Sequence, residues 1–317
     1  MTRSVRLSAY AKLNLDLRVL HKRADGYHEL RTVFQTISLA DRLEVSFTPS
    51  RRTSLELESA VDIPDNLVVR AANLVMAAAK ITGDVRFRLE KRIPLGAGMG
   101  GGSTDAAAVL LGLPVVAGKR LPTETLHELA TQLGSDVPFF LEGGTALGLG
   151  RGEELYPLPA ARLGPILVVA PGVHVSTPEA FRTLSRGLTF NGLSHTLNSF
   201  RSFVRSLSEG PSSGDKNGFA ENDFESAVFD RYPQLRALKT KLLRLGARQA
   251  LLTGSGSALF GVFANREERD AAAARFPPDV AFPVAALSRE RYQSLWRKQL
   301  RAHMTGTEWP PQSRHAR

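Results

Sequence analysis

The chain contains no cysteine, which excludes disulfide bonds, thiolate metal sites and cysteine nucleophiles. It also lacks an apolar run long enough to span a membrane, and its N-terminus enters an alternating pattern without the apolar core of a signal peptide. With 317 residues, of which 43% are hydrophobic and 23% charged, the chain can bury a substantial core, and its length suggests two domains. These features predict a cytoplasmic protein.

The phosphate-binding loop of the P-loop nucleoside triphosphatases is missing as well. That loop requires Gly-Lys followed by Ser or Thr, and the single Gly-Lys pair here, Gly118-Lys119, is followed by Arg120. A dinucleotide fingerprint does occur at Gly96, Gly98 and Gly101, but the acidic residue expected at a strand end about twenty positions later is absent. A nicotinamide or flavin enzyme is therefore an alternative that the sequence disfavours.

A glycine-rich segment is the most informative feature that is present. Five of the seven residues from 96 to 102 are glycine, and an Ala/Leu run typical of a helix follows directly. Glycine lets the backbone approach a ligand closely, and we expect Ser103 or Thr104 to cap the helix, whose first amides lack partners within the helix. This combination predicts a phosphate site. A flexible linker is the alternative, but linkers rarely run straight into an apolar helix.

The N-terminal segment alternates strictly between apolar and polar residues. From Val5 to Val19 every odd position is apolar, which predicts a strand with one buried face. Lys12 and Asn14 lie together on the other face. The strand pattern alone favours a solvent-exposed face there, and a functional site is the alternative. Asp-Gly at 25–26 then predicts a tight turn. Tyr27 and His28 follow it and could stack on a ring of a ligand or form hydrogen bonds to a polar ligand. Ordinary packing within the turn would equally explain an aromatic residue at position 27.

The rest of the chain mixes helical and strand patterns. In the first half we expect strands at 43–47, 55–57 and 85–89, a helix from 66 to about 80, a helix at 123–133 ended by Gly134, and a short helix capped by Ser135 or Asp136. In the second half we expect a buried strand at 166–169, a helix starting at 176–179, a loop at 205–219, a helix at 233–246, and a third glycine-rich segment that leads into a strand at 252–263. Antiparallel-looking strands mixed with helices favour an α+β fold.

The net charge of +10 is unevenly distributed. Residues 289–317 hold seven Lys and Arg against two Glu, which is half of the net charge, and residues 301–317 have the composition of a basic, disordered tail. The remaining chain is mildly basic and suits an anionic small substrate. A nucleic-acid binder is an alternative that basic composition alone does not establish.

In their order along the chain, six segments together resemble the GHMP kinases, the small-molecule kinases named for galactokinase, homoserine kinase, mevalonate kinase and phosphomevalonate kinase. The segments are 11–15, 23–28, 65–67, 94–107, 134–138 and 252–256. Within the family the chain is most similar to the branch that acts on 4-diphosphocytidyl-2-C-methyl-D-erythritol, because the strand with Lys12 and Asn14 leads to an Asp-Gly-Tyr-His turn. Two departures are Met99, where the family usually has leucine, and Ser-Thr-Asp at 103–105 in place of a Ser-Ser pair.

The resemblance implies a two-domain α+β architecture with mixed and antiparallel sheets and the glycine-rich phosphate loop between the domains. We expect an N-terminal nucleotide-binding domain at 1–157, a C-terminal substrate-side domain at 158–300 and the tail at 301–317. The implied reaction is ATP-dependent phosphorylation of the 2-hydroxyl of the cytidylated alcohol, in the non-mevalonate route to isoprenoid precursors, with Mg²⁺ as cofactor. The implied partners are this substrate and ATP, with no nucleic acid and no membrane; the oligomeric state stays open.

The resemblance also assigns roles to residues. Asp136 would accept the hydroxyl proton, and Lys12 would keep that carboxylate ionised and stabilise charge near the transferred phosphoryl group. Asn14, Tyr27, His28 and Thr177 would contact the substrate, with the ring of Tyr27 and the imidazole of His28 on the cytosine. The residues expected to bind ATP are Pro94, Leu95, Gly96, Ala97, Gly98, Met99, Gly100, Gly101, Gly102, Ser103 and Thr104. The magnesium ligands stay open, and Asp105 could either bind the metal or point away from it.

Besides the nucleic-acid binder named above, two rival functions remain at this point. One is a sister kinase that phosphorylates another small alcohol, such as mevalonate or homoserine. The other is a nucleotide-binding protein without catalysis, which would have no use for a base like Asp136.

Overall fold

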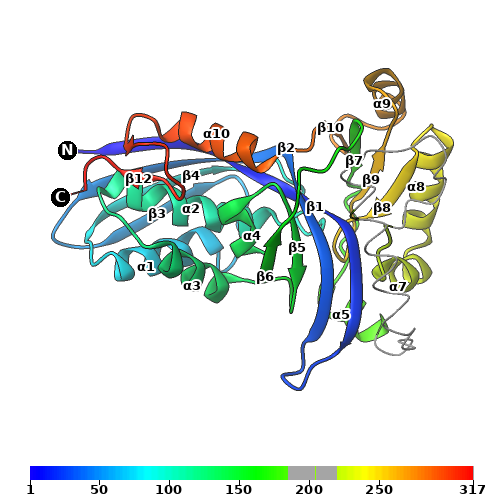
Figure 1. The fold of residues 1–317 in the computed structure, drawn as a ribbon, viewed down its shortest axis with the longest axis horizontal. Coiled ribbons are helices and arrows are strands. Elements are labelled where there is room, and N and C mark those ends of the chain that lie inside the picture. The colour runs from blue at the N-terminus through cyan, green and yellow to red at the C-terminus, as the bar shows by residue number, and fades with distance from the viewer. Residues whose placement is uncertain (185–203, 205–219, 317) are drawn as a thin grey trace.

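The computed structural model describes residues 1–184, 204 and 220–316, and it has the predicted α+β fold (Figure 1). The strands are β1 Arg3–Lys22, β2 His28–Pro49, β3 Ser54–Ser59, β4 Gly83–Glu90, β5 Thr145–Leu149, β6 Glu154–Pro157, β7 Ile166–Val169, β8 Gln249–Leu252, β9 Leu259–Val262, β10 Ala281–Val284, β11 Met304–Thr305 and β12 Gln312–Ser313. The helices are α1 Leu67–Ala78, α2 Gly101–Ala117, α3 Thr123–Leu133, α4 Val137–Glu142, α5 Thr177–Leu184, α7 Phe224–Arg231, α8 Pro233–Arg244, α9 Arg266–Ala273 and α10 Arg289–Leu300. The loop expected at 205–219 lies outside the described residues.

A long antiparallel hairpin, β1 with β2, connects the two halves of the molecule (Figure 1). The alternation in the sequence correctly predicts β1, but the expectation of a solvated polar face is wrong for its middle. Lys12 and Asn14 are 4% and 3% exposed, because a second layer of structure covers the face on which they lie. The pairing of β1 with β2 shifts register at three places, the first of them between Tyr10 and Lys12.

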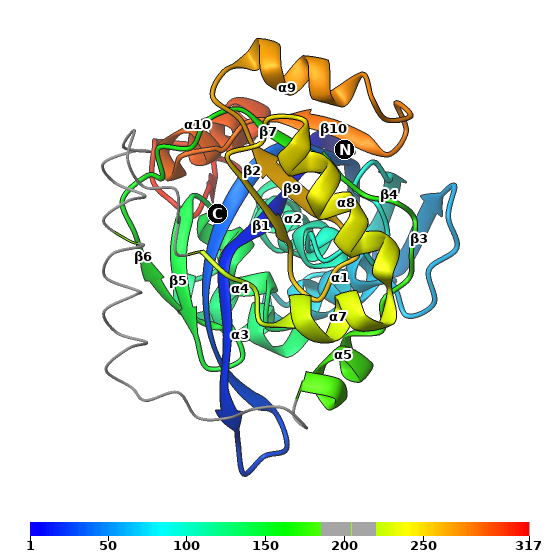
Figure 2. The same ribbon diagram turned by 90° about the vertical axis from the view of Figure 1, so that its right-hand side faces the viewer.

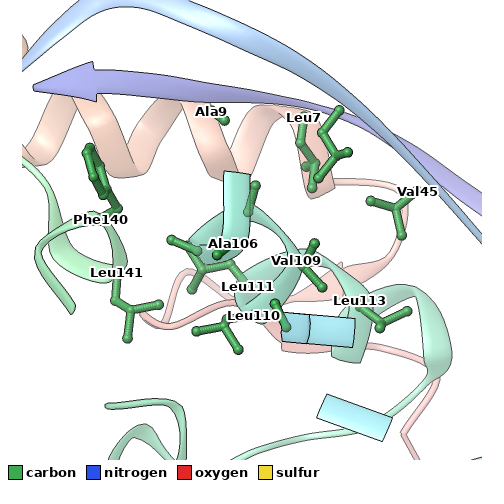
Figure 3. Close-up of a cluster of buried hydrophobic side chains, with 14 of the residues drawn as sticks. Leu7, Ala9, Val45, Ala106, Val109, Leu110, Leu111, Leu113, Phe140 and Leu141 are labelled. Carbon is green, nitrogen blue, oxygen red and sulfur yellow. The ribbon is translucent and has the colours of Figure 1, made fainter. Parts of the chain in front are cut away.

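The larger sheet has the order β3-β4-β2-β5-β6, with β1 paired to β2. Helices α1 and α2 cover one face of it, and α3 packs on α1, α2 and α4 (Figure 1). Helix α2 is buried from Thr104 to its end, as expected for a helix that is apolar on all sides after its first turn, and side chains from β1, β2 and α4 surround it (Figure 3). The packing is tight: a Cβ on Gly112 would lie 2.5 Å from Cδ1 of Leu7.

The second half forms a four-stranded antiparallel sheet in the order β10-β7-β9-β8. Helices α8 and α9 lie on its outer side (Figure 2). One hydrophobic cluster joins this sheet to the hairpin, since it contains Leu13 and Ile37 together with Val168 and Phe260. The chain then returns to the first half, where Tyr292 and Trp296 of α10 belong to the core around α2. The expected division at 157/158 stays a prediction, but α10 packs with the N-terminal half.

The C-terminal tail is ordered, so the expectation of disorder is wrong for residues 301–316. Strands β11 and β12 pair with each other, Met304 and Ser313 are buried, and the Ser313 hydroxyl donates to the Val115 carbonyl over 2.8 Å. Composition misleads here because a few well-placed contacts to α2 and α4 hold an otherwise polar segment. Within the described ranges, no helix is long and apolar enough to cross a membrane.

Two expected helix ends also differ from the structure. Helix α2 begins after Gly100, whose left-handed backbone (φ 71°) occupies the cap position, so neither Ser103 nor Thr104 is the cap. Helix α3 does end at Gly134, but with extended rather than left-handed backbone. Elsewhere the expected strands and helices of the described ranges are present, including the cap of α1, where Asn66 Oδ1 accepts from the Val68 amide.

Candidate active site

The glycine-rich loop between β4 and α2 folds against the third glycine-rich segment, between β8 and β9. Gly98 has φ 78°, and a Cβ there would lie 2.1 Å from the carbonyl oxygen of Thr253. The Ala258 amide donates to the Ala97 carbonyl over 3.2 Å, which fixes one loop on the other. Only glycine allows this approach, and the contact places the loop between the two halves of the chain, as predicted.

The loop ends at the N-terminus of α2. No side chain of the described residues caps this helix, so its first amides remain available to an anion. The helix dipole adds a partial positive charge at the same end. The geometry therefore suits phosphate groups, which is the use that the sequence predicts for residues 94–104.

Lys12 and Asp136 meet beside this loop. Nζ of Lys12 lies 3.5 Å from Oδ2 of Asp136, and the Lys12 amide donates to the Met99 carbonyl of the loop over 3.1 Å. Asp136 stands directly before α4 but makes no side-chain capping bond, and its side chain is 30% exposed. A buried ammonium thus pairs with a carboxylate that a substrate can reach. The structure brings together the two residues expected to be catalytic.

Asn14 connects Lys12 to the third glycine-rich segment. Its Oδ1 accepts from Nζ of Lys12 over 2.5 Å, and its Nδ2 donates to the Thr32 hydroxyl over 2.7 Å. The Thr253 hydroxyl accepts from the Asn14 amide over 3.0 Å. Asn14 therefore orients the lysine, and its side chain is already engaged within the protein. This places it next to the candidate catalytic pair rather than alone on the substrate side.

Tyr27 and His28 lie at the far end of the hairpin. His28 lies eight positions before Thr36, the partner of Lys12 in the sheet, which corresponds to at most about 27 Å along the strand. Tyr27 is 56% exposed, with the Arg151 guanidinium 4.9 Å from its ring centre. His28 stacks on Phe181 of α5 with ring centres 4.9 Å apart, and burial, followed by the charge of Lys22, lowers its pKa.

Thr177, the first residue of α5, lies beside the third glycine-rich segment. Its hydroxyl and that of Ser255 are 2.7 Å apart. Helix α5 therefore reaches from this segment, at Thr177, to the hairpin turn, at Phe181. The expected substrate residues thus form two groups, one near the glycine-rich loop and one at the turn, with α5 between them.

Comparisons with known proteins agree with this geometry. Residues 66–144 match the family model described as GHMP kinases N terminal domain, and residues 204–279 match GHMP kinases C terminal. A protein of Solibacter usitatus named 4-diphosphocytidyl-2-C-methyl-D-erythritol kinase is 52% identical over 99% of this chain and 98% of its own length. The chain belongs to this family of GHMP kinases.

Two further relatives support the assignment. A protein of the same name from Pelotomaculum thermopropionicum is 43% identical and covers 84% of this chain and 92% of its own length. A crystal structure of 4-(cytidine 5'-diphospho)-2C-methyl-D-erythritol kinase is 37% identical, with a TM-score of 0.75 over 89% of this chain and 98% of that chain. The two-domain GHMP kinase fold predicted from the sequence is thereby confirmed.

In this GHMP kinase, Asp105 lies in a buried ion cluster behind the glycine-rich loop. Nζ of Lys91 donates to Oδ2 of Asp105 over 2.7 Å and also to Asp41, and all three side chains are at most 5% exposed. Asp41 in turn accepts from the Ile93 amide over 2.7 Å. The cluster joins β2, the loop and α2. Of the two readings that the sequence left open, the structure favours an Asp105 that points away from the phosphates.

The cluster holds two carboxylates and one ammonium. Burial raises the pKa of Asp105 to about 7, although the charge of Lys91 acts in the opposite direction. Burial also disfavours the ammonium of Lys91, but the two carboxylates outweigh it and raise the pKa of Lys91. One cation between two anions explains why both pKa values are raised. The two carboxylates stabilise the charged form of Lys91, whereas Asp105 shares the single positive charge with Asp41 and is not fully compensated for its burial.

A magnesium ion would have few protein ligands here. Among the described residues no group of three or more His, Asp or Glu side chains is arranged to hold a metal. Asp136 offers a partly exposed carboxylate at the glycine-rich loop, and Ser103 a half-buried hydroxyl in the first turn of α2. Mg²⁺ commonly binds through one or two side-chain oxygens together with substrate phosphates and water, so the residues present fit such an ion.

Sequence reasoning missed several residues of this region. Thr253 and Ser255 lie in a segment that the sequence singled out, but no role was predicted for them. Lys91 and Asp41 gave no local signal, since they come together only when β2 and β4 pair. Phe181 could have been noticed as an aromatic residue shortly after Thr177.

Proposed function

We propose that this chain transfers the γ-phosphoryl group of ATP to the 2-hydroxyl of 4-diphosphocytidyl-2-C-methyl-D-erythritol. The observation that carries the proposal is the Lys12–Asp136 pair beside a helix N-terminus that no described side chain caps, in a chain whose relatives are named as kinases of this alcohol. Such a kinase supplies a precursor for isoprenoid synthesis. A cytoplasmic location and the lack of a nucleic-acid partner stay predictions.

Asp136 would receive the hydroxyl of the acceptor. Its carboxylate is free of capping bonds and partly exposed, so it can accept a hydrogen bond from the attacking hydroxyl. It would take the proton as the new P–O bond forms and the bond from the γ-phosphorus to the bridging oxygen of the leaving ADP breaks. The ammonium of Lys12, held by Asn14, would stabilise negative charge on the transferred group. Phosphoryl transfer depends mainly on alignment and charge stabilisation, which a buried and oriented lysine provides.

The glycine-rich loop would hold the phosphates of ATP. The first amides of α2 and the positive end of its dipole would face the negative oxygens. The contact of Gly98 with Thr253 would hold the loop in place against the third glycine-rich segment. Bound magnesium would neutralise charge on the phosphates, with Ser103 as its side-chain candidate, because Asp136 is assigned to the acceptor hydroxyl and pairs with Lys12.

The hairpin turn would recognise the cytosine. Tyr27 offers an exposed ring, and the imidazole of His28 lies beside it in the chain, stacked on Phe181. The separation of this turn from Lys12 along β2 suits an elongated substrate with a base at one end and the reacting alcohol at the other. Thr177, beside the third glycine-rich segment, would contact the substrate near the glycine-rich loop.

The test is ADP release with Mg·ATP and four candidate alcohols: the cytidylated substrate, mevalonate, homoserine and galactose. We expect turnover with the cytidylated substrate alone, and its loss in Asp136→Asn. Turnover with another alcohol would keep the fold and the chemistry but overturn the role of Tyr27 and His28. No turnover with any of the four, in a protein that binds ATP, would favour the non-catalytic rival.

A further inference from the structure

Helix α4, which follows Asp136, is only six residues long, and the C-terminal segment satisfies the carbonyls at its end. The last carbonyls of any helix lack partners within it. Here the Tyr292 hydroxyl donates to the Phe140 carbonyl over 2.5 Å, and Nε1 of Trp309 donates to the Leu141 carbonyl over 2.9 Å. Arg289 adds two bonds of 3.3 Å to the Gly143 carbonyl. All three donors come from residues 289–309.

The backbone after α4 fits this segment closely. A Cβ on Gly143 would lie 2.4 Å from Cδ1 of Tyr292, and one on Gly144 would lie 2.8 Å from Cβ of Arg289. The ring of Tyr292 also makes an edge contact with Trp309, with ring centres 6.4 Å apart. The C-terminal segment therefore determines where α4 ends, and a helix this short has little intrinsic stability to hold its position alone.

The other side of α4 contacts the candidate active site. A Cβ on Gly100, at the start of α2, would lie 2.8 Å from Cζ of the Phe140 ring, so this ring limits the position of the glycine-rich loop. The Phe139 ring packs on Phe34 with centres 4.9 Å apart, and Nζ of Lys12 lies 5.4 Å from the centre of the Phe34 ring. Phe140 and Leu141 also belong to the core around α2 (Figure 3).

We propose that Trp309 and Tyr292 are positioning residues for the phosphoryl transfer: they fix the C-terminal end of α4 and thereby the place of Asp136 relative to Lys12 and the loop. The inference rests on the role of Asp136 in the proposed function. It assigns a part in the reaction to a tail whose composition predicts disorder. Since small displacements of a reacting group cost large factors in rate, loss of one donor should lower turnover more than stability alone explains.

The test compares Trp309→Phe with Ser313→Ala. The first change keeps an aromatic ring and removes the N–H that binds α4, and the second removes a hydrogen bond from the same tail to α2. Tyr292→Phe removes a single oxygen and gives a second variant of the same kind, should Trp309→Phe fold poorly. We would measure kcat, KM for ATP, the melting temperature, and the amide hydrogen exchange of residues 137–143.

In Trp309→Phe and Tyr292→Phe we expect kcat to fall about tenfold with KM for ATP changed less than about twofold, and residues 137–143 to exchange about tenfold faster. In Ser313→Ala we expect a lower melting temperature with kcat and this exchange unchanged. If all three variants lose stability alike and keep the kcat and the exchange of wild type, the tail only stabilises the fold and the proposal is wrong.

The exchange measurement does not depend on activity. If wild type fails to phosphorylate the cytidylated alcohol, the proposed function fails. In that case, the exchange measurement still tests whether the tail controls α4. Faster exchange at 137–143 in Trp309→Phe would support this control, and unchanged exchange would refute it.

Discussion

Nζ of Lys12 lies 3.5 Å from a carboxylate oxygen of Asp136, and Asp136 makes no capping bond to the helix that follows it. From the sequence, an Asp directly before a short helix with proline in its first turn is explained equally well as a cap. The structure separates the two explanations, because the carboxylate turns to the buried lysine instead of to the helix amides.

Asp136→Asn should therefore abolish turnover and leave nucleotide binding nearly intact. Asn keeps the size of the side chain but cannot take the proton or pair with the charge of Lys12, and the loss of such a group costs about 10²–10⁴ in rate. The measurements are kcat with the cytidylated alcohol and ATP affinity by calorimetry. Equal losses of binding and turnover would show that the residue is structural. Ser135→Ala, at the neighbouring position, is the control and should keep most of the activity.

The contact of Gly98 with Thr253 makes a second prediction. Gly98→Ala would bring a Cβ to 2.1 Å from a backbone oxygen, so the two glycine-rich segments must separate, and we expect ATP affinity to fall at least about tenfold. Gly172→Ala is the matched control, because its φ of 71° carries the same backbone strain while nothing lies within 4 Å of its Cβ. It should cost about 1–2 kcal/mol of stability and leave ATP affinity unchanged. Similar affinities in both variants would contradict the role of the contact.

Much of the candidate site could be predicted from the sequence because its motifs are local. Glycines followed by an apolar helix, and a turn followed by Tyr27 and His28, carry their signal within a few residues. The burial of Lys12 and Asn14 could not be predicted in this way, since alternation reports which face of a strand is apolar and not whether a second layer covers the other face.

The sequence also could not predict that the tail is ordered or that Asp41, Lys91 and Asp105 form a cluster. Both depend on contacts between segments that are far apart in the chain: Trp309 reaches α4, and Lys91 meets Asp105 across the base of the loop. Composition averages over a segment and cannot register one indole N–H that binds a carbonyl. The same limit explains why Gly100, and not a hydroxyl residue, proves to be the cap of α2.

The stacked pair of His28 and Phe181 leads to a third prediction. His28→Ala should raise KM for the cytidylated alcohol about fivefold to tenfold, the value of one aromatic contact and one hydrogen bond, with kcat and KM for ATP little changed. His21→Ala, on the exposed end of the same hairpin, is the control and should have no effect. A rise in KM for ATP instead would place the turn at the nucleotide site and overturn its assignment to cytosine.

The buried cluster behind the loop makes the last prediction, on pH. Burial raises the pKa of Asp105 from its usual value of 3.8 to about 7 in the folded protein, so between these two pH values the folded state binds a proton that the unfolded state does not. Stability from this group is therefore fully present below about pH 4 and is lost as the pH rises through 7, with a slope of at most about 1.4 kcal/mol per pH unit.

Asp105→Asn removes this titration, because an amide stays neutral at every pH. Urea unfolding of wild type and variant at pH 5, 6, 7 and 8 should show the variant gaining stability relative to wild type as the pH rises, most steeply between 5 and 7. Parallel curves would mean that folding does not shift the pKa of Asp105, because the charge of Lys91 offsets the cost of burial. A relative loss of stability in the variant with rising pH would mean that ionised Asp105 stabilises the fold, with the ion pair to Lys91 outweighing the cost of burial.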